Sequence, residues 1–180
     1  MIRLALWLLG GLLLGGIVHL ATVLMLPRMA TQDAYARVSA VAPINAVIPM
    51  PPPTPEKAVM PFMDPAFAVS VCRYDLSRGT LKFSVPISPA YTSVSFYTRT
   101  DIAYYAINDR AAGRRVIELD LMTTEQRAAL PEDQEITAAD RLIVTSPTST
   151  GLIVIRALAP EPGLMSAART ALAAAQCRPQ

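Results

Sequence analysis

A stretch of 23 residues without Asp, Glu, Lys or Arg, residues 4–26, constrains this chain more than any other feature. At ~1.5 Å rise per residue, a helix of that length is roughly 35 Å long, enough to cross the ~30 Å hydrocarbon core of a bilayer. A cleaved secretory signal is the alternative, with Arg3 as its charge and Ala34-Tyr35-Ala36 as a weak cleavage site. Because a signal peptide has an apolar region of only about 7 to 15 residues, we expect an uncleaved transmembrane signal anchor over residues 1–28.

The expected anchor carries two features that suggest contacts inside the membrane. Gly11 and Gly15 have the spacing that lets a second helix approach closely, which makes them candidates for helix pairing. Glycine is also common in membrane helices that pair with nothing. His19 is the only histidine of the chain, and an ionisable side chain at membrane depth is either functional or a neutral hydrogen-bonding group near the interface, beside Thr22.

The two cysteines, Cys72 and Cys177, bear on the compartment of the remaining ~150 residues, which are enough for one domain. Their separation excludes a CxxC redox pair and a zinc motif, leaving either one disulfide or two free thiols. Counting basic residues near the anchor barely discriminates its orientation. Since a disulfide requires an oxidising compartment, we expect the amino terminus inside and the carboxyl-terminal domain in the periplasm, anchored to a bacterial cytoplasmic membrane.

Overall charge excludes one class of partner. The chain has 16 basic and 14 acidic side chains, a net charge of only +2, and the basic residues are scattered rather than clustered. A nucleic-acid surface is therefore not expected. Lys57 and Lys82 are the only lysines, and this preference for arginine suggests a bacterial genome rich in G and C.

Residues 29–65 are predicted to connect the anchor to the domain. Apolar residues at helical spacing between Thr31 and Ala42 predict a short juxtamembrane helix. Nine of the 16 prolines then fall between Pro27 and Pro65, which excludes helix and central strand and favours an extended spacer. A docking peptide for an aromatic groove is the alternative.

From residue 66 the apolar residues recur with a period of two, which predicts strands. Residues 67–72 and 81–85 flank a turn at Ser77-Arg78-Gly79 and predict a β-hairpin. Further strands are predicted at 92–99, 102–108, 115–121, 141–145 and 151–158, the last two flanking a loop, with helices at 124–130 and 163–176. Short strands at about ten-residue spacing are typical of an antiparallel sandwich or barrel, so residues 66–180 are expected to form a mostly β domain with a C-terminal helix.

The residues for common catalytic sites are missing from the predicted domain. A Ser-His triad is excluded, because the only histidine lies in the apolar stretch. Carboxylates, several of them in presumed turns, are candidates for acid–base chemistry or, in one loop that lacks the spacing of an EF-hand, for metal binding; they are Asp75, Asp101, Asp109, Glu118, Asp120, Glu132, Asp133, Glu135 and Asp140. We therefore predict no catalytic residue, metal or cofactor, and favour a binding or interaction module over an enzyme.

Aromatic and basic residues of the central strands form a weak candidate binding site. Tyrosine and phenylalanine cluster at positions 91–105, and aromatic walls with a few basic or amide groups are typical of ligand and partner pockets. The alternative is a sheet with tyrosines packed on one face and arginines in water. The candidate residues are Arg73, Tyr97, Arg99, Tyr105, Asn108 and Arg110.

Four segments resemble, in order, a family called domain of unknown function 1254. They are residues 75–86, 91–97, 104–110 and Ser146-Pro147-Thr148 leading into 151–158, so the resemblance covers about residues 64–160. It implies a β-sandwich or jelly-roll-like fold and an envelope location, and it assigns no catalytic residue. Long members join this domain to a second β domain, numbered 1214, whereas this chain looks like a short membrane-anchored form.

The resemblance also bears on partners and on the competing function. Besides the lipid bilayer, it makes a separate membrane protein carrying domain 1214 a candidate partner. The alternative to a binding module is an enzyme or enzyme subunit completed by residues of such a partner.

Overall fold

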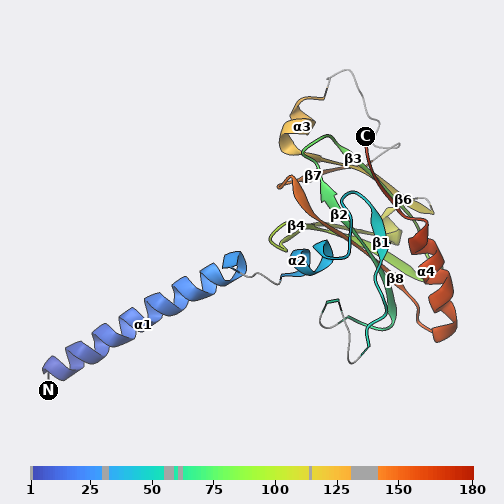
Figure 1. Cartoon of the computed structure of the whole chain (residues 1–180). Coiled ribbons are helices and arrows are strands. Elements are labelled where there is room, and N and C mark those ends of the chain that lie inside the picture. The colour runs from blue at the N-terminus through green and yellow to red at the C-terminus, as the bar shows by residue number, and fades with distance from the viewer. Residues whose placement is uncertain (1, 30–32, 55–58, 61–62, 114, 131–141) are drawn as a thin grey trace. The chain divides into compact units, whose positions relative to one another are not determined.

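The computed structural model describes residues 2–29, 33–54, 59–60, 63–113, 115–130 and 142–180 (Figure 1). They form two compact units, Met1–Asp33 and Ala34–Gln180. The first unit contains one helix, α1 (Ile2–Met29). Its segment Ile2–Leu26 is long and apolar enough to cross a membrane.

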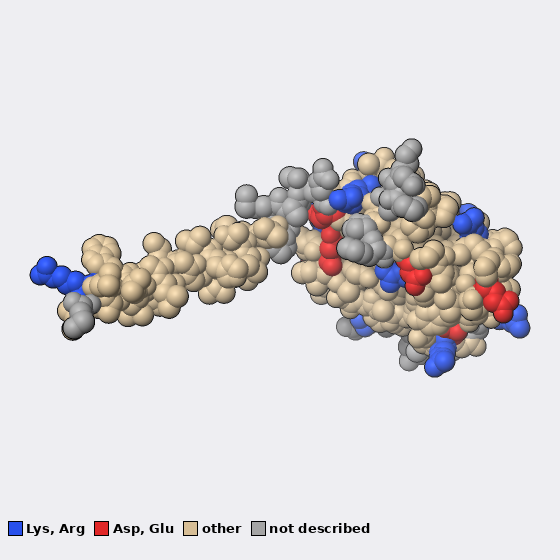
Figure 2. Space-filling view, turned by 90° about the horizontal axis from the view of Figure 1, so that it is seen from below, with Lys and Arg blue, Asp and Glu red and all other residues tan. Residues whose placement is uncertain are grey.

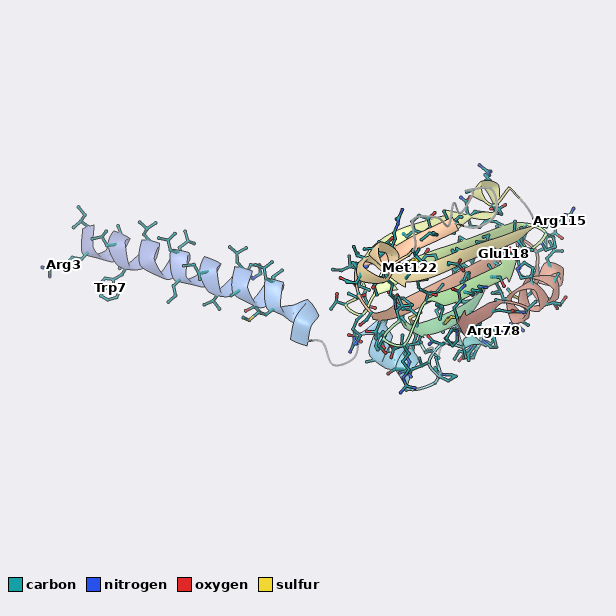
Figure 3. All side chains as sticks on the ribbon, turned by 90° about the horizontal axis from the view of Figure 1, so that it is seen from above. Arg3, Trp7, Arg115, Glu118, Met122 and Arg178 are labelled. Carbon is teal, nitrogen blue, oxygen red and sulfur yellow. A yellow bond between two sulfur atoms is a disulfide. The ribbon has the colours of Figure 1, made fainter. Side chains whose placement is uncertain are left out.

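The surface of α1 fits that interpretation. On the side visible in Figure 2, the described side chains of α1, residues 2–26, are uncharged except for basic atoms near the amino-terminal end. Arg3 and Trp7 lie at this end (Figure 3), and both residue types are common where a membrane helix meets the headgroups. Inside the helix the Thr22 hydroxyl donates to the carbonyl of Val18 at 2.8 Å, so it needs no partner elsewhere.

The second unit is a β-sandwich with a C-terminal helix, which confirms the predicted fold class (Figure 1). Among the described residues, nine strands form two sheets. The five-stranded sheet has the order β1 (Val47–Pro49), β2 (Phe67–Asp75), β8 (Thr150–Leu158), β4 (Tyr91–Thr98), β5 (Ala103–Asn108). The four-stranded sheet has the order β7 (Leu142–Ser146), β6 (Val116–Thr123), β3 (Leu81–Pro86), β9 (Gln176–Pro179). Every strand pair described is antiparallel except β6 and β7, which run parallel.

In the described part of this unit, five short helical segments accompany the sheets: α2 (Ala34–Ser39), η1 (Asp109–Ala111), α3 (Thr124–Ala128), η2 (Pro162–Leu164) and α4 (Met165–Ala173). α3 begins at a capping box, in which Thr123 and Gln126 each bond the other's backbone N–H. α4 is shorter than the helix predicted for residues 163–176, because the chain turns at Ala174 and continues as strand β9 beside β3. The predicted helix start at Thr31 lies outside the described residues.

The connections between strands differ from the predicted ones. β2 and β3 are not a hairpin, since they belong to different sheets, and Leu76 between them is fully buried in the core. β7 and β8 likewise lie in different sheets. Alternating residues on both sides of a turn predict two strands, but not whether the two strands pair with each other. The hairpin that does form joins β4 to β5, through a turn in which Asp101 adopts a positive φ of 60°.

The core between the sheets is aromatic at its centre and fastened covalently. The rings of Phe83 and Phe96 meet edge to face, with centroids 6.1 Å apart, and α4 adds Leu172 to the same cluster. A disulfide joins Cys72 on β2 to Cys177 on β9, with Cα atoms 6.5 Å apart. The sequence leaves a disulfide and free thiols open; in the structure the bond links one sheet to the other.

A second apolar cluster lies on the outer face of the five-stranded sheet. Val38, Ala42 and Met50 pack there against Val71 and the apolar side chains of β8. Residues 34–50, assigned from the sequence to a juxtamembrane helix and a spacer, thus belong to the compact unit, which begins at Ala34 rather than at residue 66. Prolines do not prevent this, since Pro49 lies at the end of β1, an edge strand.

Candidate functional site

Three of the six side chains predicted as a weak binding site lie at one end of the five-stranded sheet. Arg73 and Tyr97 face outward on either side of Leu152, in register across β2, β8 and β4. The Nε atom of Arg73 is buried and has no hydrogen-bond partner among the described residues. Arg99 lies just beyond β4, and its guanidinium stacks on the Tyr35 ring of α2, 4.1 Å from the ring centroid.

The other three predicted side chains lie elsewhere. A bulge at Phe96 makes Tyr104 an extra residue of β5, so Tyr104 and its neighbour Tyr105 both approach the Phe96 ring, at 6.2 and 5.8 Å. Tyr105 therefore packs against the core. Asn108 accepts the backbone N–H of Arg110 as the cap of η1, and Arg110 is exposed. The six residues thus do not form one pocket.

Hydroxyl groups form a buried cluster between the sheets. The Tyr74 hydroxyl donates to the carbonyl of Tyr97 at 3.2 Å, lies 2.9 Å from Ser146 Oγ on β7 and accepts from Tyr104 at 3.2 Å. Burial raises the pKa of Tyr104 far above its ordinary value, and the adjacent Tyr74 adds to the effect. Gly151 permits the arrangement, because a Cβ there would collide with the Tyr74 ring and the Tyr97 carbonyl. Because Tyr74 lies on β2 and Ser146 on β7, the cluster links the two sheets.

The candidate carboxylates are spread over the domain. Asp75 is the last residue of β2, where the backbone N–H of Ser77 donates to its carboxylate at 2.8 Å and lowers its pKa. Asp101 lies in the β4–β5 turn, and Glu118 and Asp120 lie on β6. The acidic loop considered for metal binding falls within residues 131–141, outside the described residues. In the part of the chain that is described, no three His, Cys, Asp or Glu side chains gather closely enough to hold a metal ion.

An open groove of about 600 Å³ lies on the outer face of the five-stranded sheet. Three adjacent strands form its floor, with Val69, Arg156 and Ser93 side by side in one row. Phe67 and Tyr91 lie in the next row, both opposite Leu158. The floor therefore combines apolar and aromatic side chains with one guanidinium group.

The walls of this groove come from the segment between α1 and β2. Met60 and Met63 add flexible apolar side chains, and Ala34 marks the start of α2. Asp64 also lines the groove, but its Oδ1 accepts the N–H of Ala66 at 2.9 Å. Arg156, which is exposed, is therefore the polar group best placed to select a ligand. Apolar walls around a few polar groups are typical of a small-molecule site.

A second hollow, of about 360 Å³, lies on the outer face of the four-stranded sheet. Glu118 on β6 and Arg178 on β9 belong to it (Figure 3). Lys82 lies between Asp120 and Arg178 in the register, and the Gln180 amide donates to Asp120 at 3.3 Å. Its two acidic groups, both on β6, are matched by two basic groups, one on β3 and one on β9. Acidic and basic groups are also interspersed over the visible face of the unit in Figure 2. This hollow offers a ligand no single dominant charge.

Sequence reasoning included Tyr91 in the aromatic cluster at positions 91–105 but did not single out Arg156 or the methionine walls of the groove. A usable signal was present in residues 152–155, an uninterrupted apolar run. Such runs are typical of strands that are buried on both faces. The run therefore indicates that the outer face of β8 is covered by another segment of the chain or forms a binding site.

Comparison with known proteins places the chain in a family. The model of the family described as "Protein of unknown function (DUF1254)" matches residues 44–179, so the chain belongs to this family and the resemblance noted in the sequence is confirmed. No curated protein matches the sequence. The family match begins near β1, which agrees with its place in the folded unit.

Two solved structures are similar to the chain. The VPA0106 protein from Vibrio parahaemolyticus superposes with a TM-score of 0.60 at 13% identity, covering 83% of this chain and 35% of that one. A putative uncharacterized protein from Burkholderia cenocepacia gives a TM-score of 0.46 at 14% identity, covering 76% of this chain and 34% of that one. The Vibrio structure shows a shared fold. The chain spans about a third of the length of each structure it matches.

Proposed function

We propose that this member of the DUF1254 family is a single-pass envelope protein whose α1 anchors it in the cytoplasmic membrane and whose β unit is a periplasmic binding module. The observation that carries the proposal is a disulfide, Cys72–Cys177, in a chain that also has an apolar helix of spanning length. Disulfides persist in the periplasm and are rare in the cytosol, which favours the orientation with the amino terminus inside.

Thiol trapping in cells tests the compartment. Because the chain has only two cysteines, a maleimide-polymer reagent added to acid-quenched, denatured cells should shift the full chain only after reduction. The single variant Cys177→Ser is the matched control and should shift once without reduction. In parallel, protease should digest the β unit in spheroplasts and spare it in intact cells. Two free thiols together with protection in spheroplasts would place the unit in the cytoplasm and refute the proposal.

The groove on the five-stranded sheet gives the binding module its candidate ligand class. An exposed guanidinium at one side of an apolar, aromatic hollow suits an amphipathic molecule with a carboxylate or phosphate group. The apolar part would lie along Phe67, Met60 and Met63, and the acid would pair with Arg156. Charge-assisted bonds contribute about 1.5–3 kcal/mol, so losing this one should weaken binding by roughly 10- to 100-fold.

Octanoate and octanol have the same chain length, but only octanoate carries an acid group. Comparing them separates the contribution of the acid group to binding from that of the apolar chain. We expect nanodiscs holding the full chain to bind octanoate more tightly than octanol by titration calorimetry, after subtraction of empty nanodiscs. Arg156→Gln should remove that difference. Arg178→Gln, on the other sheet, is the matched control and should preserve it. Equal binding of octanoate by wild type and Arg156→Gln would exclude the groove as an acid-binding site.

We further propose a partner, a separate membrane protein that carries the companion β domain numbered 1214. Support comes from the resemblance to long members of the family, which join the two domains in one chain. Affinity purification of the intact protein from mild detergent, followed by mass spectrometry, should recover such a protein. Recovery of the chain alone, under conditions in which a known envelope complex survives, would contradict this partner.

A further inference from the structure

Exposed apolar side chains of the β unit gather at one end. Outside α1, the described residues expose four large apolar side chains: Ile102 (64%), Ile44 (52%), Val41 (51%) and Leu164 (37%). Isolated cases are normal on protein surfaces. Here three of the four lie around α2 and the β4–β5 turn, whereas Leu164 lies in η2 before α4. A single exposed apolar side chain needs no explanation, but three at one end of the unit do.

The strand register places the three residues at the same end of the five-stranded sheet. Arg73, Leu152, Tyr97 and Ala103 lie side by side across β2, β8, β4 and β5. Ile44 forms a bridge with Arg73 at one corner of this row. At the other corner Ile102 directly precedes Ala103, and Val41 follows α2, which packs on the sheet between them. η2 follows the opposite end of β8, where Leu158 pairs with Phe67 and Tyr91.

This end is also where the chain arrives from α1. The backbone N–H of Ala34, the first residue of the β unit, donates to the Asp101 carboxylate at 3.1 Å. The turn that holds Asp101 is well defined, since Thr98 N–H donates to the Ile102 carbonyl at 2.9 Å and Ile102 N–H to Thr98 Oγ1 at 3.1 Å. Ile102 is therefore exposed on a fixed turn. The same turn is hydrogen-bonded, through Asp101, to Ala34, the residue at which the connecting segment ends.

The sequence limits how far this end can lie from a bilayer that α1 crosses. Ala34 follows Leu26, the last residue of the apolar segment, by eight positions. Even fully extended, eight residues reach only about 28 Å. An end of the domain with three exposed apolar side chains is thus tethered within a short reach of the headgroups.

We propose that Val41, Ile44 and Ile102 form a membrane-contact surface that inserts into the headgroup layer of the bilayer holding α1. The inference rests on the anchor of the proposed function, but not on which side of the membrane the β unit lies. Charged side chains of the β unit border this end and fit a headgroup layer: Arg37 lies on α2, Arg73 on β2, and Arg99 and Asp101 in the β4–β5 turn. Burying the three apolar side chains there fixes the orientation of the groove relative to the membrane.

A fluorescent label at residue 102 tests the contact in the full chain. Both native cysteines are in the disulfide, so Ile102→Cys supplies the only free thiol for an environment-sensitive NBD dye. The chain is placed in nanodiscs of phosphatidylcholine and phosphatidylglycerol, with a doxyl quencher near the lipid headgroup. Leu164→Cys is the matched control. We expect blue-shifted emission and severalfold stronger quenching at residue 102 than at residue 164.

Equal, weak quenching at both positions would overturn the proposal while leaving the anchor intact. Failure of the chain to enter nanodiscs would overturn the anchor and this contact together. A blue shift without lipid quenching would assign the surface to a second copy or another protein and refute the membrane contact. Val41→Cys repeats the measurement, so a folding defect of one variant does not decide the result.

Discussion

The two faces of the five-stranded sheet are built for different tasks. Its inner face is packed fully against the second sheet and α4, and a disulfide crosses the interface. Its outer face is divided, with one end under α2 and the residues that follow it and the other end open as a groove. The difference teaches that stability in this fold resides on the inner face, whereas the outer face provides the surfaces that can bind.

Neighbouring residues of β4 give the sharpest test of this comparison. Phe96 points inward and is fully buried, whereas Tyr97 points outward and is half-buried. Phe96→Ala should lower the free energy of unfolding by about 3–5 kcal/mol, because a buried ring leaves a cavity. Tyr97→Ala should cost about 1–2 kcal/mol, since less area is buried. Urea titration in detergent, followed by near-ultraviolet circular dichroism, measures both. Equal losses would mean that both faces contribute alike.

The disulfide tests whether the inner interface depends on its covalent link. Replacing Cys72 and Cys177 together by serine removes a cross-link between residues 105 positions apart. The expected loss is about 2–4 kcal/mol, because the unfolded chain gains freedom. Reduction of the wild type should lower its free energy of unfolding in a urea titration by a similar amount. The same treatment should leave the stability of the double variant unchanged. A double variant as stable as the oxidised wild type would show that packing alone holds the sheets together.

The outer-face cluster tests whether residues 34–50 are part of the folded unit. Val38 is fully buried against the sheet, so Val38→Ala should cost about 2 kcal/mol from two lost methyl groups and the cavity they leave. Val41→Ala is the matched control, three residues on and exposed, and should change stability little in the same urea titration. If Val38→Ala also leaves the free energy of unfolding unchanged, residues 34–50 are a spacer rather than part of the folded unit.

This segment also shows how far sequence reasoning reaches. Period-two alternation predicted the strands and the mostly β class, because each strand has one face in the main core. It did not predict β1 or α2 as parts of the unit, since prolines permit both an extended spacer and an edge strand. Alternation also did not predict which strands pair. The residues around Leu76 are compatible both with a hairpin and with a connection that crosses from one sheet to the other. Pairing is decided by contacts between segments far apart in sequence.

The candidate site was harder to predict for a related reason. Tyr105 entered the predicted site as an aromatic residue near arginines, but a bulge turns it into the core. A bulge shifts every later side chain to the other face, and one sequence carries no signal for it. Arg156 was overlooked because a single arginine in an apolar strand resembles any exposed position. Only the register across β2, β8 and β4 places it in a groove.

The hydroxyl cluster yields the smallest predicted effect and depends on pH. Burial raises the pKa of Tyr104, so the folded state favours its neutral form. Stability is therefore unaffected below the ordinary tyrosine pKa of about 10 and falls as pH rises above it, where only the unfolded chain ionises freely. Tyr104→Phe should cost about 0.5–1.5 kcal/mol at neutral pH, through the lost bond to Tyr74. It should also flatten the alkaline decline in urea midpoint, whereas Tyr91→Phe, on the outer face, should not. An undiminished decline in Tyr104→Phe would show that the inner-face cluster does not control alkaline stability.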